Sequence, residues 1–497
     1  MDFLDPKKQL RHKILLILGY VLIACVVIGA TTVLLYEAYG FGLGKGGKII
    51  QYGLVYLSSQ PNPAYVTVNG KLISSSTNTS LTLPEGIYNI TLSRKGYRTW
   101  SRNIEVDGGT IEDYTYPLLI PVNLQTTNVK SYASAPEIAT QSPSRQWLLV
   151  QHSSTSLNFD LYDLSNPAKA PTQVAIPANL VSSHVTSESW KVIAWANDNQ
   201  HVLLEHIFDG KIEYILFDIA NPSQSINLSQ TLKNISFTSI ELNNGHYNQY
   251  YLYNSANDTL MTDNLSSPTS PTTVLTNVLS YDAYNGNTIL YATTNNAPPG
   301  EVDINELIGN KNYLIKKFKA GSQYLLNMAG YNGSIYVVAG SSNDNKVYIF
   351  DNPVGQIQSA PKDLPVPIQV LFIHNPNFVS FSDNTQFIMA ESGNTFAVYN
   401  LENSSGYNYT TTLPIDAPQL NATWMDGDRM TYVSGGKLIM FEYDHNYQQT
   451  LMPADSNYLP FFTPGYNYVY TLTNNKNSHI SLTRTSLYTS ADQPQKL

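Results

Sequence analysis

The sequence predicts an all-β protein held at a membrane by one N-terminal transmembrane helix, with a small β-sandwich followed by a β-propeller. Three observations support this fold class: an uncharged apolar run over residues 14–36, short alternating strands over 51–121, and a weak repeat from about residue 130 onward. The composition agrees, because abundant Tyr, Val, Ile and Thr with frequent Gly, Pro and Asn breaks favour strands and turns over helices.

Residues 14–36 form the predicted transmembrane helix. At about 1.5 Å rise per residue this run spans roughly 34 Å, enough for the ~30 Å hydrocarbon core of a bilayer. The positive-inside rule then keeps residues 1–13 in the cytoplasm and places the bulk of the chain outside, extracellular or periplasmic. The basic residues that determine this topology precede the run: Lys7, Lys8, Arg11 and Lys13.

A cleaved signal peptide is the alternative to this anchor. Leu22-Ile23-Ala24-Cys25 matches a bacterial lipoprotein cleavage box, and Cys25 is the single cysteine of the chain. A signal h-region is about 7 to 15 residues long and ends at the cleavage site, whereas eleven further apolar residues follow Cys25 here. We therefore expect an uncleaved anchor, with lipidation of Cys25 as the lesser alternative.

The charge balance argues against one class of partner. Charged residues make up 13% of the chain, about half the usual share, so Asn, Ser, Thr, Gln and the 36 Tyr form much of the polar surface. Residues 1–36 hold four of the 28 basic and two of the 37 acidic residues, so the remainder carries a net charge of −11. Such an acidic exterior argues against binding nucleic acid or anionic lipid.

Residues 37–50 predict a flexible, glycine-rich linker between the helix and the first domain. This linker holds two imperfect nucleotide-binding motifs, Gly42-x-Gly44-x-x-Gly47 and Gly42-x4-Gly47-Lys48. Neither motif follows a strand or opens a helix, and Ile49 occupies the position where a P-loop needs Ser or Thr. We therefore expect no cofactor to bind here.

The alternating strands over residues 51–121 predict the small β-sandwich. Asn69-Gly70 is typical of a hairpin turn, because both residues tolerate positive φ. An ordered series of motifs runs through the segment: Ser59-x-Pro61, Ala64-x-Val66-x-Val68-Asn69-Gly70, Leu83-Pro84-Glu85-Gly86, Ile90-x-Leu92, Arg94-Lys95-Gly96-Tyr97 and Ile104-x-Val106.

These motifs resemble the PEGA domain family over about residues 52–121. Two features depart from the family pattern: Ile87 stands where a small residue is expected, and no Gly-x-Thr-Pro turn follows Gly70. The resemblance implies a small β-sandwich of bacterial and archaeal surface proteins that serves binding or spacing. It carries over no catalytic residue.

Residues 122–497 predict a β-propeller with a period of roughly 46 residues. The repeat is anchored on the buried second strand of each unit, starting near Gln146, His201, Gln249, Thr288, Ile335, Gln386, Met430 and Tyr468. Eight blades are favoured and seven are possible. The ring is expected to close by pairing a strand from 122–135 with one from 478–488. The units resemble the WD40-like and TolB-like repeats of bacterial propellers.

The chain contains no Gly-x-Ser-x-Gly nucleophile elbow and no His-Glu-x-x-His motif. We therefore expect no catalytic, metal-binding or cofactor-binding residue, and the sequence leaves the ligand-binding residues unknown. The nearest metal-like cluster is His201, Glu205 and His206, but the two-residue period of a strand points His206 to the opposite face. The other histidines considered for a shared site in the channel are His152, His184, His246, His374, His445 and His479.

Two further patterns have ordinary structural explanations. Acidic turns such as Asp426-Gly-Asp428 have the oxygen-rich character of calcium loops but lack the EF-hand spacing, so β-turn chemistry explains them. The Tyr-rich stretches over 247–253 and 458–470 are typical of packing between blades. A sugar- or peptide-binding surface is the alternative interpretation of these stretches.

The order of anchor, linker, sandwich and propeller predicts a non-enzymatic envelope or surface protein of a prokaryote. Its partners are expected to be another envelope protein or a cell-wall or glycan ligand, with no nucleic acid. One alternative is a propeller enzyme, either a hydrolase or an oxidoreductase, that acts outside the membrane. A second alternative is an envelope assembly scaffold.

Overall fold

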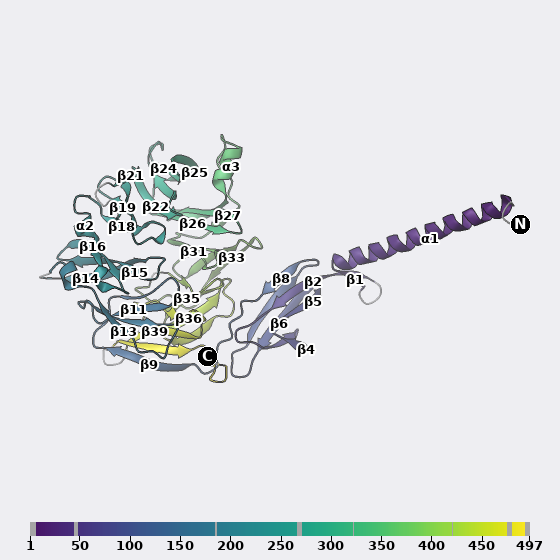
Figure 1. The fold of residues 1–497 in the computed structure, drawn as a ribbon, viewed down its shortest axis with the longest axis horizontal. Coiled ribbons are helices and arrows are strands. Elements are labelled where there is room, and N and C mark those ends of the chain that lie inside the picture. Colours follow the sequence, from purple (N-terminus) through teal and green to yellow (C-terminus); the bar gives the residue numbers. More distant parts are fainter. Residues whose placement is uncertain are drawn as a thin grey trace. The chain divides into compact units, whose positions relative to one another are not determined.

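The computed structural model describes residues 6–43, 48–183, 186–265, 271–321, 323–419, 421–474 and 480–492. Two compact units account for the chain: residues 1–123 together with 488–497, and residues 124–487. The N-terminal unit contains a helix and a small sandwich, and the second unit contains a series of four-stranded sheets (Figure 1).

Helix α1, Pro6–Ala38, contains the predicted apolar run. Its most apolar window lies within Lys8–Ala38, and none of that window is buried inside the protein. Leucine, isoleucine, valine and alanine dominate the run, and leucine and alanine are strong helix formers. Among the described residues this is the one helix that is long and apolar enough to cross a membrane.

The sandwich consists of two sheets. Strand β2 lies at the centre of the first sheet, with β5 antiparallel on one side and β1 and β8 on its other edge. The second sheet has the order β4-β3-β6-β7. The bounds are β1 Phe41–Leu43, β2 Ile49–Leu57, β3 Tyr65–Val68, β4 Lys71–Ser76, β5 Thr79–Pro84, β6 Gly86–Ser93, β7 Trp100–Val106 and β8 Ile111–Tyr114.

Alternate residues of these strands form the sandwich core. Val55 and Leu57 of β2, Ile90 and Leu92 of β6, and Trp100 of β7 are all buried. This alternation is the two-residue period of strands with one buried face. The expected hairpin at Asn69-Gly70 is confirmed, because both residues have positive φ between β3 and β4.

The prediction of a flexible linker over residues 37–50 is wrong for the residues that the structure describes there. Helix α1 runs to Ala38, and β1 pairs with the start of β2, so Gly42 lies opposite Ile50. The reason is Gly40, whose φ of +76° makes a tight turn, and whose carbonyl oxygen accepts a hydrogen bond from the Tyr52 amide at 2.7 Å. Residues 44–47, which complete the two nucleotide-like motifs, lie outside the described residues.

The C-terminal segment also differs from expectation. Residues 488–492 group with the sandwich, and not with the propeller expected over 122–497. Arg94 forms an ion pair with Asp492, and the Thr489 amide donates to the Tyr97 hydroxyl oxygen at 2.9 Å. These contacts hold the segment against the turn between β6 and β7.

The second unit is built from four-stranded antiparallel sheets in chain order. Eight such sheets occur in the described residues between 124 and 487. The first four contain β10 Ala139–Gln141, β11 Trp147–Gln151, β12 Asn158–Asp163 and β13 Thr172–Ala175; β14 Glu188–Trp195, β15 His201–Phe208, β16 Lys211–Asp218 and β17 Ile226–Asn227; β18 Ser239–Leu242, β19 Gln249–Asn254, β20 Thr259–Asn264 and β21 Thr272–Leu275; β22 Val278–Tyr284, β23 Thr288–Thr293, β24 Glu301–Ile308 and β25 Lys311–Lys319.

The next four sheets complete the unit. They contain β26 Tyr324–Tyr331, β27 Ser334–Ser341, β28 Asp344–Asp351 and β29 Gln369–Phe372; β30 Phe378–Phe381, β31 Phe387–Ser392, β32 Thr395–Asn400 and β33 Ser405–Thr410; β34 Thr423–Trp424, β35 Arg429–Ser434, β36 Lys437–Glu442 and β37 Gln449–Pro453; β38 Phe461–Phe462, β39 Tyr468–Asn474, β40 Ile480–Ser486 and β9 Gln125–Tyr132. Two short helices, α2 Leu228–Thr231 and α3 Pro353–Ser359, and three 3₁₀ turns, Ala178–Leu180, Pro222–Gln224 and Asn243–Gly245, lie in the connections.

The sheets close into a ring, as in a β-propeller (Figure 1). Strand β9, from the start of the unit, pairs antiparallel with β40 at its end, so that Tyr132 lies opposite Ile480. One buried cluster then joins the last sheet to the first, with Leu472 and Leu482 packed among Leu148 and Val150. The expected closure by a strand from residues 122–135 is confirmed.

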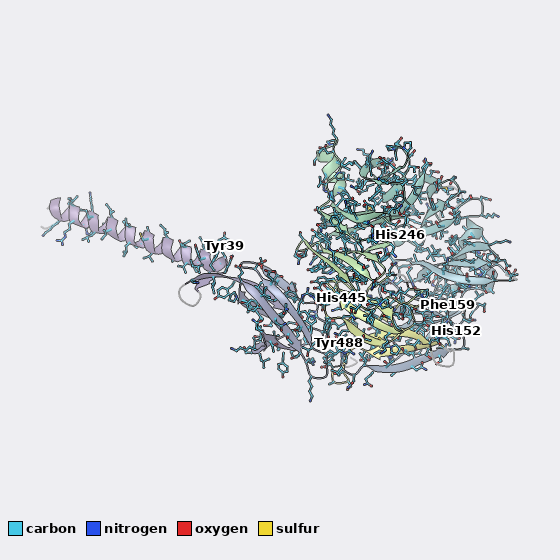
Figure 2. All side chains as sticks on the ribbon, turned by 180° about the vertical axis from the view of Figure 1, so that it is seen from behind. Tyr39, His152, Phe159, His246, His445 and Tyr488 are labelled. Atoms are coloured by element: carbon cyan, nitrogen blue, oxygen red, sulfur yellow. The ribbon has the colours of Figure 1, made fainter. Side chains whose placement is uncertain are left out.

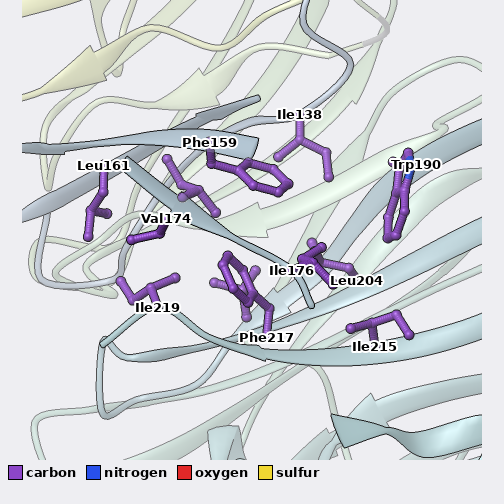
Figure 3. Close-up of a cluster of buried hydrophobic side chains, with 12 residues drawn as sticks. Ile138, Phe159, Leu161, Val174, Ile176, Trp190, Leu204, Ile215, Phe217 and Ile219 are labelled. Atoms are coloured by element: carbon purple, nitrogen blue, oxygen red, sulfur yellow. The ribbon is translucent and has the colours of Figure 1, made fainter. Parts of the chain in front are cut away.

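Apolar side chains fill the spaces between neighbouring sheets. The cluster between the first and second sheets contains Phe159, Trp190 and Phe217, with the rings of Phe159 and Phe217 5.6 Å apart (Figure 3). Each sheet has two apolar faces, and it buries both only when it has a neighbour on each side. The ring therefore follows from the near-continuous apolar second and third strands of the repeats.

Candidate functional site: the inner turns of the ring

The innermost strand of each sheet is its first. First strands of neighbouring sheets contact one another. For example, β14 contacts β18, and β26 contacts both β22 and β30. Each first strand reaches the second through a short turn, and we call these the inner turns. Since the first strands line the axis of the ring, all inner turns gather at one mouth of it.

The inner turns share one backbone feature. In seven of the eight sheets described, a residue other than glycine has positive φ there: Arg145, Asn199, Asn244, Asn285, Asn332, Thr385 and Tyr466. Asparagine tolerates this left-handed conformation, but Arg, Thr and Tyr adopt it rarely. Strained backbone of this kind clusters at binding and catalytic sites. Arg145, Thr385 and Tyr466 therefore single out one side of the mouth.

Hydrogen bonds join the inner turns to one another. The Ser144 amide donates to Oδ1 of Asn199 at 2.8 Å, between the first and second sheets. The Thr385 hydroxyl donates to the Gly330 carbonyl oxygen at 2.7 Å, between the sixth and fifth sheets. These bonds fix the position of each turn relative to its neighbours, so the mouth is a preorganised surface.

Arg145 lies at the centre of this surface. Its guanidinium donates to the Met425 carbonyl oxygen at 2.7 Å and lies 4.9 Å from the centre of the Tyr466 ring. It also donates to the Tyr466 hydroxyl and forms an ion pair with Asp383. Arg145 of the first sheet thus contacts the inner turns of the sixth, seventh and eighth sheets.

Two carboxylates shape the electrostatics at Arg145. Burial raises the pKa of the Asp383 carboxyl above its ordinary value, and repulsion by Asp426 adds to this rise, while Arg145 opposes it. The Asp383 side chain is nonetheless 47% exposed, so solvent and a ligand can reach it. Burial also raises the pKa of Tyr466, so this residue remains a neutral hydrogen-bond donor.

A groove of about 570 Å³ adjoins the inner turn of the second sheet and the start of β11 in the first sheet. Trp147, Val174 and Ile219 supply its apolar walls, and Asp198 and Asn199 supply polar groups. An apolar groove with a few convergent polar groups is the usual form of a binding site. The groove and the Arg145 cluster lie on the same side of the ring, because inner-turn residues contribute to both.

The structure divides His201, Glu205 and His206 between the two faces of β15. His201 and Glu205 lie on one face, and His206 lies on the other. His201 contacts Asp198 at 2.6 Å and stacks on Tyr247, while Glu205 pairs with Lys191 at 3.0 Å. His206 is fully buried on the opposite face. Among the described residues, no group of three or more His, Cys, Asp or Glu is arranged to hold a metal ion.

His206 belongs to a buried network that sequence reasoning missed. Its Nδ1 lies 2.8 Å from Glu213 and its Nε2 lies 3.1 Å from Glu188, and its ring stacks on Trp190 at 4.2 Å. Glu188, Trp190, His206 and Glu213 lie on the three successive strands β14, β15 and β16. Their register, with Trp190 opposite His206 and His206 opposite Glu213, is the signal that unites them.

Of the other histidines considered for the channel, those that the structure describes do not gather. His152 contacts Asp160, His374 contacts Asn375, and His445 stacks on Tyr409. Figure 2 shows His152, His246 and His445 well separated. His184 and His479 lie outside the described residues.

The remaining candidates have structural roles. Asp426 accepts hydrogen bonds from the amides of Asp428 and Arg429 and pairs with the Arg429 side chain, so it stabilises the turn. In the Tyr-rich stretches, Tyr250 and Tyr251 are buried. Tyr466 is the exception, because it contributes to the mouth.

Comparison with protein families identifies one part of the chain. Residues 52–118 match the PEGA domain family. Comparison with curated proteins gives no sequence match.

Solved structures similar to this chain include propellers. Oligogalacturonate lyase in complex with manganese is 8% identical, with a TM-score of 0.40 over 74% of this chain and 99% of that one. The Dos1 propeller is 10% identical, with a TM-score of 0.43 over 73% and 94%. The Cps50 (Swd1) β-propeller domain from Myceliophteria thermophila is 9% identical, with a TM-score of 0.35 over 73% and 100%. The order of the sheets and the pairing of β9 with β40 establish the ring.

Proposed function

We propose that this protein is a non-enzymatic, membrane-anchored envelope or surface protein of a prokaryote. Helix α1 serves as a single-pass anchor with a cytoplasmic N-terminus, and the PEGA domain and the propeller lie outside. Support for the anchor comes from α1 itself, whose apolar window is fully exposed. Arg11 and Lys13 precede the run, which fits the positive-inside rule.

Binding occurs at the mouth formed by the inner turns, and the partner is an envelope protein or a cell-wall glycan. The single observation that carries this proposal is the Arg145 cluster, in which one strained arginine contacts the inner turns of three other sheets. A ligand with a carboxylate exchanges for Asp383 on Arg145, and hydroxyl groups bond to the exposed Asp383 carboxylate. The groove beside Trp147 supplies apolar contact for the same ligand.

Cross-linking and pull-down on intact cells test this proposal. The tagged full chain is expected to capture one envelope protein or wall polymer, with cross-links near the inner turns. Protease added outside intact cells is expected to degrade the propeller. A propeller protected from protease overturns the topology, and capture through the opposite mouth overturns the binding surface.

A further inference from the structure

The end of the sandwich nearest α1 shows an unusual concentration of exposed apolar side chains. We call this the near end, and it comprises Tyr39, Ile49, Ile87 and Ile111. Their exposed fractions are 68%, 60%, 73% and 66%. They come from four elements: the turn after α1 and the starts of β2, β6 and β8. Large apolar side chains that gather on one surface mark a contact with a partner or a membrane.

Strand register places these residues at the same end. Strand β2 begins at Ile49, and its Tyr52 lies opposite Pro84, just before β6 starts. The Glu85 amide donates to the Gln51 carbonyl oxygen at 3.0 Å. Strand β8 runs parallel to β2 and begins with Ile111 opposite Leu54. These positions place the four residues in the half of the sandwich where the chain arrives from the helix.

The connection between helix α1 and the near end is very short. Only Tyr39 separates Ala38, the last residue of α1, from Gly40, whose carbonyl oxygen is held by the Tyr52 amide at 2.7 Å. The Gln51 side chain donates to the Tyr39 carbonyl oxygen at 3.2 Å. If α1 spans a bilayer, this short connection keeps the near end of the sandwich close to the membrane surface.

The side chains at this junction suit a lipid interface. Tyr36 and Phe41 have ring centres 5.1 Å apart, and Tyr39 follows the end of the apolar run. Aromatic residues of this kind are enriched where a transmembrane helix meets the headgroups. The near end also carries the exposed carboxylates Glu85, Glu105 and Asp107, together with the exposed ammonium of Lys48. The net negative charge of these four groups repels anionic lipid, so the complementary surface is a bilayer of zwitterionic phospholipid.

We propose that the near end of the PEGA domain docks on the lipid headgroups, with Tyr39, Ile49, Ile87 and Ile111 in contact with a zwitterionic bilayer. This inference rests on the proposed function of α1 as an anchor. The contact fixes the orientation of the sandwich, because the domain is held by its helix and by its own apolar end.

The test compares three labelled versions of the full chain in phosphatidylcholine vesicles. Each carries one polarity-sensitive fluorophore on a cysteine: the native Cys25, Ile87→Cys or Tyr65→Cys, the last two in a Cys25→Ser background. Tyr65 is the matched control, because it is 64% exposed and lies opposite Ser93, at the far end of β6 from Ile87. Quenching by nitroxide lipids and by iodide in the buffer is then measured.

The expected result is strong lipid quenching at position 25, severalfold stronger lipid quenching at 87 than at 65, and strong iodide quenching only at 65. Lipid quenching at 25 with equal iodide quenching at 87 and 65 overturns the docking and leaves the anchor intact. Absence of lipid quenching at 25 overturns the anchor, and the docking with it.

Discussion

The Lys130 ammonium nitrogen lies 2.5 Å from a carboxylate oxygen of Asp160. Lys130 is on β9, the strand that closes the ring, and Asp160 is on β12 of the first sheet, with a side chain only 1% exposed. The Tyr132 hydroxyl of β9 donates to the same carboxylate at 2.9 Å. The closing strand is therefore held on one side by its ladder with β40 and on the other by a buried carboxylate.

Asp160→Asn removes the charge that holds Lys130 and Tyr132. Removing one partner of a buried ion pair costs about 3–5 kcal/mol, and we expect about 3 because Lys130 is 34% exposed and can reach water. Unfolding in urea measures the loss. The control is Glu205→Gln, whose partner Lys191 is 63% exposed, and for which we expect a loss below about 1 kcal/mol. Equal losses in the two variants would contradict a special role for Asp160.

The same carboxylate makes stability fall in acid. Burial pushes the pKa of Asp160 upward, but hydrogen bonds from Lys130, His152 and Tyr132 together overcome this and hold the pKa below its ordinary value. A folded pKa below the unfolded value gives stability that is present above about pH 4 and is lost as the pH falls through the folded pKa. The difference in unfolding free energy between the wild type and Asp160→Asn is therefore expected to shrink between about pH 5 and pH 2. A constant difference across this range would contradict the assignment.

Glu306 has the opposite pH dependence. Its side chain is 3% exposed, one of its oxygens has no hydrogen-bond partner, and burial raises its pKa to about 7. A raised folded pKa gives stability that is present below about pH 4 and is lost as the pH rises toward 7. Glu306→Gln is expected to stabilise the propeller at pH 8 by roughly 3 kcal/mol, with little effect at pH 4. Thermal unfolding at the two pH values checks this, with the exposed Asp363→Asn as a control that changes neither.

His206 is expected to be essential for folding of the second sheet. Both ring nitrogens contact buried carboxylates, so His206→Ala leaves Glu188 and Glu213 without the imidazole that lies between them. We expect a loss of about 3–5 kcal/mol in the free energy of unfolding. His201→Ala, on the other face of the same strand, is the matched control with a loss below about 1 kcal/mol. Similar stability of the two variants would show that the network is not important.

The ring was predictable because its signal is local. The expected second strands begin within one residue of the observed ones, for example at His201 and Thr288, since an apolar run after a polar turn marks a buried strand wherever it occurs. The linker over 37–50 was mispredicted for the same reason. Its glycines indicate flexibility locally, but the backbone partner of Gly40 is Tyr52, which lies in the next strand.

The Arg145 cluster at the mouth was not predictable from the sequence. Arg145 and Asp383 are 238 residues apart, and Tyr466 is 321 residues from Arg145. Only closure of the ring brings their turns together, and nothing in the local sequence around Arg145 distinguishes it from other polar turns. The left-handed backbone of Arg145 is a signal that only coordinates reveal.

Arg145→Gly separates binding at this mouth from stability. Glycine adopts the φ of +61° found at Arg145 without strain, and relief of that strain contributes roughly 1 kcal/mol. Loss of the guanidinium contacts works against this gain, so we expect the unfolding free energy to change by less than about 1 kcal/mol. Capture of a partner from intact cells is expected to fall at least about tenfold, because Asp383 and Tyr466 lose the group that positions them.

The matched control is Asn285→Gly, which relieves the same left-handed backbone conformation in the inner turn of the fourth sheet. Asn285 belongs neither to the sheets that Arg145 contacts nor to the lining of the groove beside Trp147. Capture by this variant is expected to stay within about threefold of the wild type. If Arg145→Gly folds as the wild type does and still captures its partner, binding does not occur at the inner turns. The opposite mouth of the ring is then the surface to test.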